Sequence, residues 1–373
     1  MMHWEYRQPV RIVFGNGVIH QLAEEIKSLG GNNGILITSS SFERRGDADI
    51  ICKISENRIK HLFSHVTANP TVKECDVCMA IMKKEHCDFV VAMGGGSVMD
   101  LAKAAATFCL TDNSSADYLA TGKSIPAEHL PVIAVPTTAG TGSEITCVAV
   151  LSDHERGMKS PINSNGFYPL VAIVDPELTY TVPPYMTACT GFDVICHAIE
   201  AYWSKYHQPI CDALAVHAAK LAMDNLEKAY NHPDDKDARS NMAEASVMAG
   251  LAFTMPKTTS AHACSYPLTN LLGIPHGEAC ALTITWFIRF NARKGCQRID
   301  ALAQLLGYQN YEALADTLDD MRRRLGLRMN LKEFNLDKQQ FEQLVEGSKH
   351  PNLKNNPIEV TEKDLRKLYQ ELE

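Results

Sequence analysis

The sequence predicts an α/β domain with a parallel sheet over residues 1–178, followed by an all-helical domain over residues 179–373. In the first half, short β-branched runs alternate with amphipathic stretches, a pattern typical of a parallel sheet covered by helices. After about Asp175 the strand patterns end, and apolar residues recur at helical spacing. Pro176, Pro183 and Pro184 lie at this change, and proline interrupts both helices and strands. We therefore place the domain boundary there.

The individual elements follow from the same patterns in chain order. Buried strands, each ending in small or turn residues, are expected at 34–40, 88–97, 130–140 and 170–178. Amphipathic helices are expected between them, among others at 18–29 and 71–85. In the second half, longer helices are expected at 187–204, 210–230, 242–253 and 278–291.

The charge balance excludes some classes of partner. The chain carries a net charge of −8 and no block of lysine and arginine, so a nucleic-acid partner is not expected. The N-terminus lacks the apolar segment of a signal peptide, and no run reaches the roughly 18 apolar residues that cross a membrane. We expect a cytoplasmic protein with no membrane partner.

The cysteines fit the same compartment. Twelve cysteines are scattered without a disulfide framework, which in a chain of 373 residues predicts reduced, mostly buried thiols. Cys75 and Cys78 have CxxC spacing, but no second pair follows to complete a zinc site. We therefore interpret them as packing residues of a helix.

Two glycine-rich turns follow predicted strands. Gly94, Gly95, Gly96 and Ser97 lead directly from a strand into a helix, whose first N–H groups and positive dipole end suit a phosphate. The second turn, 137–143, carries hydroxyl residues and two glycines. Because such loops meet at the carboxyl edge of a parallel sheet, together they predict a nucleotide or dinucleotide site. Neither has GxGxxG spacing or the phosphate lysine of a P-loop.

Histidines in the second half predict a metal site. Asp193 and His197 are four residues apart on a predicted helix, so their side chains lie on one face. His262 and His276 lie in apolar surroundings of the same half. A single buried histidine is more often a packing residue than a ligand. Three with a carboxylate favour a metal ion, and iron(II), zinc and manganese all suit this donor set.

Four motifs together resemble one family. "GGGSVMDLAKA", "PTTAGTGSE", "GFDVICHAIEAYWS" and "LLGIPHGEA" occur in the order and at the separations of the iron-dependent (group III) alcohol dehydrogenases, and the likeness extends over nearly the whole chain. The resemblance implies a dinucleotide-binding α/β domain, a helical metal-binding domain, and hydride transfer between NAD(P)H and a small aldehyde. It also implies a homodimer or larger homo-oligomer.

The resemblance also assigns residues. It implies that the metal ligands are Asp193, His197, His262 and His276. It implies dinucleotide contacts from Ser39, Asn69, Gly95, Gly96, Ser97, Thr137, Thr138, Thr141 and Gly142, and from Lys159, which falls near the nicotinamide. Lys159 and Tyr266 are the candidate catalytic residues.

Two departures from the family pattern matter. The family commonly has a second histidine four residues after the third metal ligand, where this chain has Tyr266, so the proton path differs or runs through water. NAD-preferring relatives place an aspartate where this chain has Ser39. With Arg44 and Arg45 nearby, NADP is admissible, although these arginines read equally well as solvated surface charges.

The segments "AHACSYPLT" and "GIPHGEAC" most resemble the branch that reduces phosphonoacetaldehyde and sulfoacetaldehyde. This likeness implies a small anionic substrate, with Lys159, Ser265 and Tyr266 as candidate partners. One alternative is a reductase of small neutral aldehydes. Another is a metal- and NAD-dependent lyase resembling dehydroquinate synthase. A non-catalytic sensor is disfavoured, because the sequence has no effector or DNA-binding element.

Overall fold

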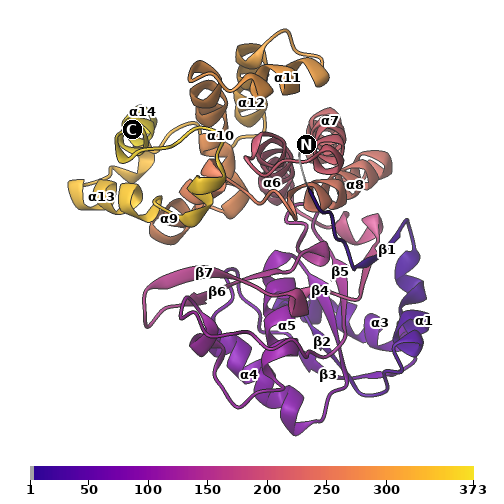
Figure 1. Cartoon of the computed structure of the whole chain (residues 1–373). Helices are drawn as coiled ribbons and strands as arrows, with labels where there is room; N and C mark the ends of the chain where they lie inside the picture. The colour runs from indigo at the N-terminus through magenta and orange to yellow at the C-terminus, as the bar shows by residue number, and fades with distance from the viewer. Residues whose placement is uncertain (1–3) are drawn as a thin grey trace. The chain divides into compact units, whose positions relative to one another are not determined.

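The computed structural model describes residues 4–373, and the chain divides into two compact units (Figure 1). The α/β unit comprises Gln8–Thr138 and Gly142–Thr179. Of the described residues, the helical unit comprises Tyr180–Glu373 together with Ala139–Thr141 and residues 4–7. The predicted fold class, a parallel α/β part and an all-helical part, is confirmed. The boundary between residues 178 and 179 stays a prediction.

The α/β unit is built on a six-stranded parallel sheet of order β1-β8-β5-β4-β2-β3. Its strands are β1 (Arg11–Phe14), β2 (Gly34–Ile37), β3 (Ile59–Phe63), β4 (Phe89–Gly94), β5 (Val132–Pro136) and β8 (Val171–Val174). The four predicted strands are the four central ones. The sequence did not reveal β1 and β3, because these edge strands are partly exposed and lack the continuous apolar pattern of a buried strand.

Helices cover both faces of this sheet (Figure 1). They are α1 (Leu22–Ser28), α2 (Ser40–Arg45), α3 (Asp47–Ile54), α4 (Val72–Lys84) and α5 (Gly96–Phe108). Side chains alternate along each strand, so Val90 belongs to the core under α4 and α5, whereas Val91 belongs to the core under α1 and α3. Cys75 and Cys78 are buried on α4 and contact methionine sulfurs, in agreement with a packing role.

An antiparallel hairpin, β6 (Val148–Asp153) and β7 (Met158–Asn163), accompanies the sheet. Its second strand is mostly half-exposed and contains a proline, so it carries no clear strand signal. Ser152 pairs with Lys159, and an isolated bridge joins Ser152 to Thr71. The hairpin therefore brings Lys159 toward the segment that precedes α4.

The helical unit contains nine α-helices within the described residues. They are α6 (Pro184–Trp203), α7 (Pro209–Asn231), α8 (Lys236–Phe253), α9 (Ser260–Leu272), α10 (His276–Arg293), α11 (Gln297–Leu305), α12 (Tyr311–Arg324), α13 (Lys338–Gly347) and α14 (Glu362–Leu372). Single-turn 3-10 helices occur in both units at Val18–Gln21, Ser115–Tyr118, Ser143–Ile145, Asn165–Phe167, Pro176–Thr179, Lys332–Phe334 and Pro351–Asn355.

The centre of the helical unit is α6, which is buried almost continuously from Thr187 to Trp203. It packs against α7, α8 and α10. An all-round buried helix has no solvent to hydrate its polar side chains, so each needs a partner from a neighbouring helix. Across residues 4–373, no helix has both the length and the apolar character that a membrane crossing requires.

Candidate metal centre and cofactor loops

Asp193 is the meeting point of the predicted metal ligands. Its Oδ1 lies 3.9 Å from Nδ1 of His197, which is one turn further along α6. The same oxygen lies 3.4 Å from Nε2 of His262 on α9 and 3.8 Å from Nε2 of His276, the first residue of α10. Two atoms bound at about 2.1 Å to one tetrahedral ion are about 3.4 Å apart, so these separations suit a shared ion.

The buried atoms at this point lack hydrogen-bond partners. Among residues 4–373, Asp193 Oδ1, His197 Nδ1 and His262 Nε2 are all buried and without one. Asp193 and His262 are only 2% and 3% exposed, so water does not replace the missing partners. An unpaired buried polar atom costs about 1–3 kcal/mol, and three facing one another need a common compensating group. A divalent cation supplies that group.

Glu200 sets the orientation of His262. Its carboxylate lies 2.5 Å from His262 Nδ1 and also accepts hydrogen bonds from the backbone N–H groups of Thr259 and Ala261. With the ring proton held on Nδ1, Nε2 presents its lone pair toward Asp193. The sequence analysis missed Glu200, although its position seven residues after Asp193 places both on one face of α6.

Ser265 sets the orientation of the His276 ring. The Ser265 hydroxyl donates to the backbone oxygen of His262 at 2.7 Å, so toward His276 Nδ1, 3.2 Å away, it acts as an acceptor. His276 therefore carries its proton on Nδ1 and leaves Nε2 free to accept. Ser265 is fully buried and its hydroxyl is already used in this way, so it is a poor candidate for contacting substrate.

Gly277 allows α10 to approach α6. A Cβ at this position would lie 2.0 Å from the backbone oxygen of Cys189 and 3.0 Å from Cβ of Asp193. Any larger residue would therefore separate the two helices. The glycine in the predicted motif thus keeps His276 within reach of Asp193.

The protonation states of Asp193 and His197 suit a cation. Burial raises the pKa of Asp193, but the neighbouring His197, His276 and His262 outweigh it and hold the pKa below its usual range. Burial lowers the pKa of His197 to about 4, partly opposed by the charge of Asp193. At neutral pH the carboxylate is charged and His197 is neutral, which are the forms that bind metal.

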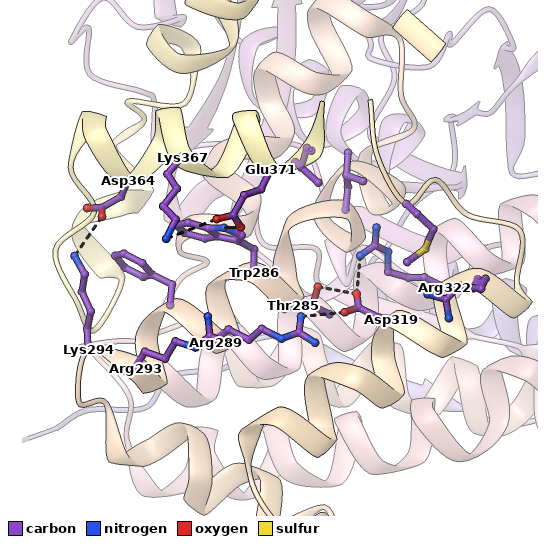
Figure 2. A pocket seen from close by; sticks show the side chains of 15 residues that line it. Thr285, Trp286, Arg289, Arg293, Lys294, Asp319, Arg322, Asp364, Lys367 and Glu371 are labelled. Carbon is purple, nitrogen blue, oxygen red and sulfur yellow. Dashed lines mark hydrogen bonds and ion pairs between the residues drawn. The ribbon is translucent and has the colours of Figure 1, made fainter. Parts of the chain in front are cut away.

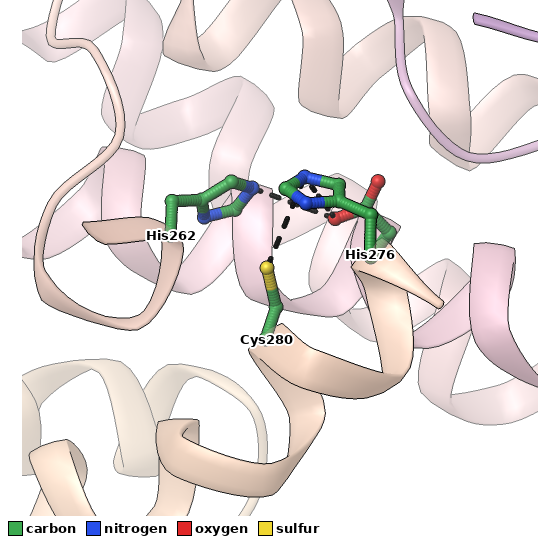
Figure 3. Close-up of side chains that lie close together, drawn as sticks. His262, His276 and Cys280 are labelled. Atoms are coloured by element: carbon green, nitrogen blue, oxygen red, sulfur yellow. Dashed lines mark hydrogen bonds and ion pairs between the residues drawn. The ribbon is translucent and has the colours of Figure 1, made fainter. Parts of the chain in front are cut away.

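Cys280 is a further donor that the sequence analysis missed. It lies one turn after His276 on α10, and its Sγ is 4.0 Å from His276 Nε2 (Figure 3). Donor atoms of Asp193, His262, His276 and Cys280 all lie within 4.8 Å of one another, and His197 is not a member of this set. The spacing of His276 and Cys280, four residues apart, was the available signal.

In the α/β unit, the predicted cofactor loops follow neighbouring strands. The chain runs from β2 outward to β3, then returns to β4 on the other side of β2. The ends of β2 and β4 therefore form the switch point at which open α/β sheets bind ligands. Ser39 follows β2, Gly95 follows β4, and Thr137 and Thr138 follow the next strand, β5.

The turn after β4 is shaped for a close ligand. Gly95 is the N-cap of α5 and makes no side-chain capping bond, so the first N–H groups of this 13-residue helix have no such cap. A Cβ on Gly95 would lie 3.3 Å from Thr138 Oγ1. Gly96 and Ser97 are the first two residues of α5. The uncapped start of α5 and the close approach of the two loops are features that suit a phosphate group.

Three predicted cofactor residues are linked by hydrogen bonds. Lys159 Nζ donates to Asn69 Oδ1 at 2.7 Å, and the Asn69 backbone N–H lies 3.4 Å from Ser97 Oγ. Asn69 has a left-handed backbone with φ of 59°. These three residues are far apart in sequence. The fold of the α/β unit brings them together, although the family resemblance assigned each of them to the cofactor separately.

The remaining predicted residues lie in different settings. Gly142 has a φ of 60° and caps the turn Ser143–Ile145, whereas Thr141 belongs to the helical unit. Ser39 hydrogen-bonds to Ser41 at 2.8 Å. Arg45 is exposed and pairs with Asp47, which favours the surface-charge interpretation for this arginine.

Tyr266 stacks on a histidine that the sequence analysis did not select. The rings of Tyr266 and His350 are 4.5 Å apart, and Tyr266 is 6.4 Å from the ring of His276. His350 accepts a hydrogen bond from the Asn352 backbone N–H through Nδ1, and burial lowers its pKa to about 4. Tyr266 therefore lies beside a neutral imidazole at neutral pH.

A separate cavity of about 400 Å³ lies among α10, α12 and α14 (Figure 2). Lys294 pairs with Asp364, and Arg289 pairs with Asp319. Trp286 donates its indole N–H to Glu371. Because Lys294 and Arg289 already pair with acidic residues, the cavity wall does not resemble an anion site.

Comparison with known proteins gives a consistent result. The family model described as "Iron-containing alcohol dehydrogenase" matches residues 9–176, and "Fe-containing alcohol dehydrogenase family, C-terminal" matches residues 187–372. A solved structure of sulfoacetaldehyde reductase from Bifidobacterium kashiwanohense, in complex with NAD+, is 52% identical, with a TM-score of 0.97 and coverage of 100% of this chain and 99% of that one.

Two curated relatives are less similar in sequence. Long-chain-alcohol dehydrogenase 1 of Geobacillus thermodenitrificans is 34% identical over 96% of each chain. Alcohol dehydrogenase 4 of Schizosaccharomyces pombe is 33% identical over 96% of this chain and 86% of its own length. The similarity therefore extends over both units.

Proposed function

The chain belongs to the iron-containing alcohol dehydrogenase family, and from this premise we propose that it reduces a small anionic aldehyde of the sulfoacetaldehyde or phosphonoacetaldehyde type. The family resemblance read from four motifs is confirmed, and with it a metal-dependent, NAD(P)-linked oxidoreductase. The single observation that carries the substrate class is the 52% identity to a sulfoacetaldehyde reductase over the full chain.

We propose that Asp193, His197, His262 and His276 hold the metal ion, with iron(II) as the first candidate and zinc or manganese as alternatives. The unpartnered buried atoms at Asp193 Oδ1 and His262 Nε2 support this assignment. In the proposal, Glu200 holds His262 and Ser265 holds His276 in the tautomer whose Nε2 is free to bind the metal.

For the cofactor, the proposed phosphate contacts are the turns at Gly95–Ser97 and Thr137–Gly142, with Ser39 toward the ribose. Asn69 and Lys159 would be held in place for the nicotinamide end by their mutual hydrogen bond. When bound, the metal supplies a Lewis acid for the substrate oxygen and the nicotinamide supplies the hydride. The protein contributes position, by fixing donor atoms on buried helices and loops on a rigid sheet.

Lys159 and Tyr266 are proposed as the residues that act on the reacting groups. The pairing of Lys159 with Asn69 supports a role beside the cofactor. Tyr266 is held against His350, which is a setting in which a phenol can relay a proton or contact the substrate. We further propose a cytoplasmic homodimer, folded as domains 1–178 and 179–373.

The test measures oxidation of NADH and of NADPH by anaerobically purified protein that is reconstituted separately with iron, zinc and manganese. The substrates are sulfoacetaldehyde, phosphonoacetaldehyde, glycolaldehyde, propanal and butanal. We expect the highest kcat/KM with an anionic aldehyde. His276→Ala should lose this activity, and its matched control is His217→Ala, since His217 lies in an exposed pair with Glu244 in the same unit.

The other outcomes distinguish the alternatives. A preference for propanal or butanal would keep the family assignment and overturn the anionic substrate. Tight NAD binding without net NADH oxidation by any aldehyde would favour a lyase resembling dehydroquinate synthase. The ratio of NADPH to NADH rates decides whether Ser39 tolerates a 2′-phosphate.

A further inference from the structure

Cys280 has no role in the donor set proposed above, although it lies beside it. Its side chain is fully buried, and Figure 3 shows the thiol pointing toward the ring of His276 from the next turn of α10. Sγ is 4.0 Å from His276 Nε2. The thiol therefore belongs to the metal centre by position rather than to the general packing of the helical unit.

The arrangement offers the ion two alternative donors. Asp193, His262, His276 and Cys280 present donor atoms within 4.8 Å of one another, and His197 lies outside that set. His197 Nδ1 is nevertheless 3.9 Å from Asp193 Oδ1, and its ring stacks on Phe253. An ion at this point can thus take an imidazole from α6 or a sulfur from α10 as its next ligand.

We infer that Cys280 is a metal ligand that selects divalent ions with affinity for thiolate: zinc and cobalt are held by Asp193, His262, His276 and Cys280, with the thiolate taking the place of His197. The inference rests on the metal site of the proposed function. Thiolate is the softest of the available ligands and favours zinc over iron(II) or manganese, which accept imidazole and carboxylate. On binding, the S–H bond breaks, the proton leaves to solvent and the sulfur donates its electron pair, with no change in oxidation state.

This ligand set has a consequence for activity. Four protein donors complete the tetrahedral shell that zinc prefers, whereas catalytic zinc sites keep one position open for water or substrate. The zinc-loaded enzyme should therefore turn over more slowly than the iron- or manganese-loaded enzyme. Cys280 then acts as a discriminator between metals.

The experiment uses metal-free full-length protein titrated anaerobically with cobalt(II) and followed by absorption spectroscopy. Wild type is compared with Cys280→Ser and with the matched control Cys211→Ser, a buried thiol of α7 outside the donor set. We expect a near-ultraviolet thiolate-to-cobalt charge-transfer band in wild type and in Cys211→Ser, and its loss in Cys280→Ser. The visible ligand-field bands should persist in all three proteins.

Competition titrations give a second readout. The preference for zinc over manganese should fall in Cys280→Ser by at least about tenfold, the lower end of the effect of disturbing even an outer-shell partner. If Cys280→Ser does not fold, Cys280→Ala serves in both measurements. Visible cobalt bands without a thiolate band in wild type would overturn the role of Cys280 alone. Absence of any cobalt spectrum would overturn this inference together with the proposed metal site.

Discussion

Each unit buries a polar cluster, and the two clusters differ in how completely they are satisfied. In the α/β unit, fully buried Lys103 donates to the Ser143 hydroxyl at 2.6 Å and backbone oxygen at 3.0 Å, and to the Val148 backbone oxygen at 2.5 Å. Asp100 lies 3.5 Å from the same ammonium group. In the helical unit, by contrast, Asp193 and His262 face each other through atoms that have no hydrogen-bond partner.

The difference indicates a structural role for the Lys103 cluster and a metal-binding role for the Asp193 cluster. The Lys103 cluster contains its own cation, so its charges are balanced by the protein alone and it closes the loop between β5 and β6. The Asp193 cluster contains acceptors turned toward one another, an arrangement that costs folding free energy unless a cation arrives from outside. We therefore expect metal to matter greatly to one cluster and not at all to the other.

The largest expected effect is the loss of the metal. His276→Ala should lower kcat/KM at least about a thousandfold, since a Lewis acid is worth several kcal/mol in such reactions. Metal added at about 100 times its dissociation constant should stabilise wild type by about 2.7 kcal/mol and this variant hardly at all. The measurements are steady-state kinetics and thermal unfolding with and without manganese.

The fold of the metal-free variant should survive, because the His276 side chain is 33% exposed and the least buried of the donors. His217→Ala is the control and should behave as wild type in both measurements. A His276→Ala protein that retains both activity and metal-dependent stabilisation would remove His276 from the ligand set.

The next largest effect tests the Lys103 cluster. Lys103→Met should destabilise the α/β unit by about 3 kcal/mol, because it leaves the Asp100 carboxylate and three backbone oxygens without their cation. The control is Lys27→Met, since Lys27 pairs with Glu56 on the surface and should change stability by less than about 0.5 kcal/mol.

The three tryptophans, Trp4, Trp203 and Trp286, all lie in the helical unit, so their fluorescence reports its unfolding and far-ultraviolet circular dichroism reports both units. Urea titrations followed by both signals should place the Lys103→Met effect in the dichroism transition. Wild-type stability by dichroism would contradict a structural role for Lys103.

These two clusters also mark what the sequence could predict. The central strands and long helices were predictable because continuous apolar runs and helical periodicity reflect burial directly. The hairpin of β6 and β7 was not, because partly exposed strands are stabilised by pairing with each other and by a contact at Thr71 that lies far away in sequence. The buried role of Lys103 could not be predicted for the same reason, because its hydrogen-bond partners lie some 40 residues further along the chain.

In the metal centre, residue types and spacing predicted that Asp193 and His197 face the same point. They could not predict that Glu200 fixes the tautomer of His262, since this depends on how α9 packs against α6. Cys280 was overlooked because a thiol in an apolar helix resembles ordinary packing. Its role depends on the close approach at Gly277, which only the folded chain reveals.

A smaller effect concerns a carboxyl beside the Lys103 cluster. Burial raises the pKa of Glu144 to about 7, against the lowering effect of Lys103. Because the folded pKa lies above the unfolded one, the folded state holds the extra proton. The resulting stability is complete below about pH 4.5 and is lost as the pH rises through about 7, by at most about 3 kcal/mol.

Glu144→Gln should remove this loss, so its urea midpoint should stay level from pH 6 to pH 8 while that of wild type falls. Glu24→Gln, a change at an exposed carboxylate of α1, is the control and should follow wild type. Parallel pH profiles for wild type and Glu144→Gln would mean that Glu144 is ionised in the folded protein.

The smallest effect tests the link between the unsatisfied centre and its support. Glu200→Gln replaces a carboxylate that accepts from His262, Thr259 and Ala261 through both oxygens by an amide with only one accepting oxygen, so the hold on His262 weakens. Metal affinity should fall about 10- to 100-fold, measured by competition titration with a chelator. Glu244→Gln is the matched control, because Glu244 pairs with His217 at 3.1 Å on the surface of the same unit and has no connection to the metal. If a folded Glu200→Gln protein bound metal as tightly as wild type, Glu200 would have a structural role only, as Lys103 has. The difference between the two clusters would then depend on the four metal donors alone.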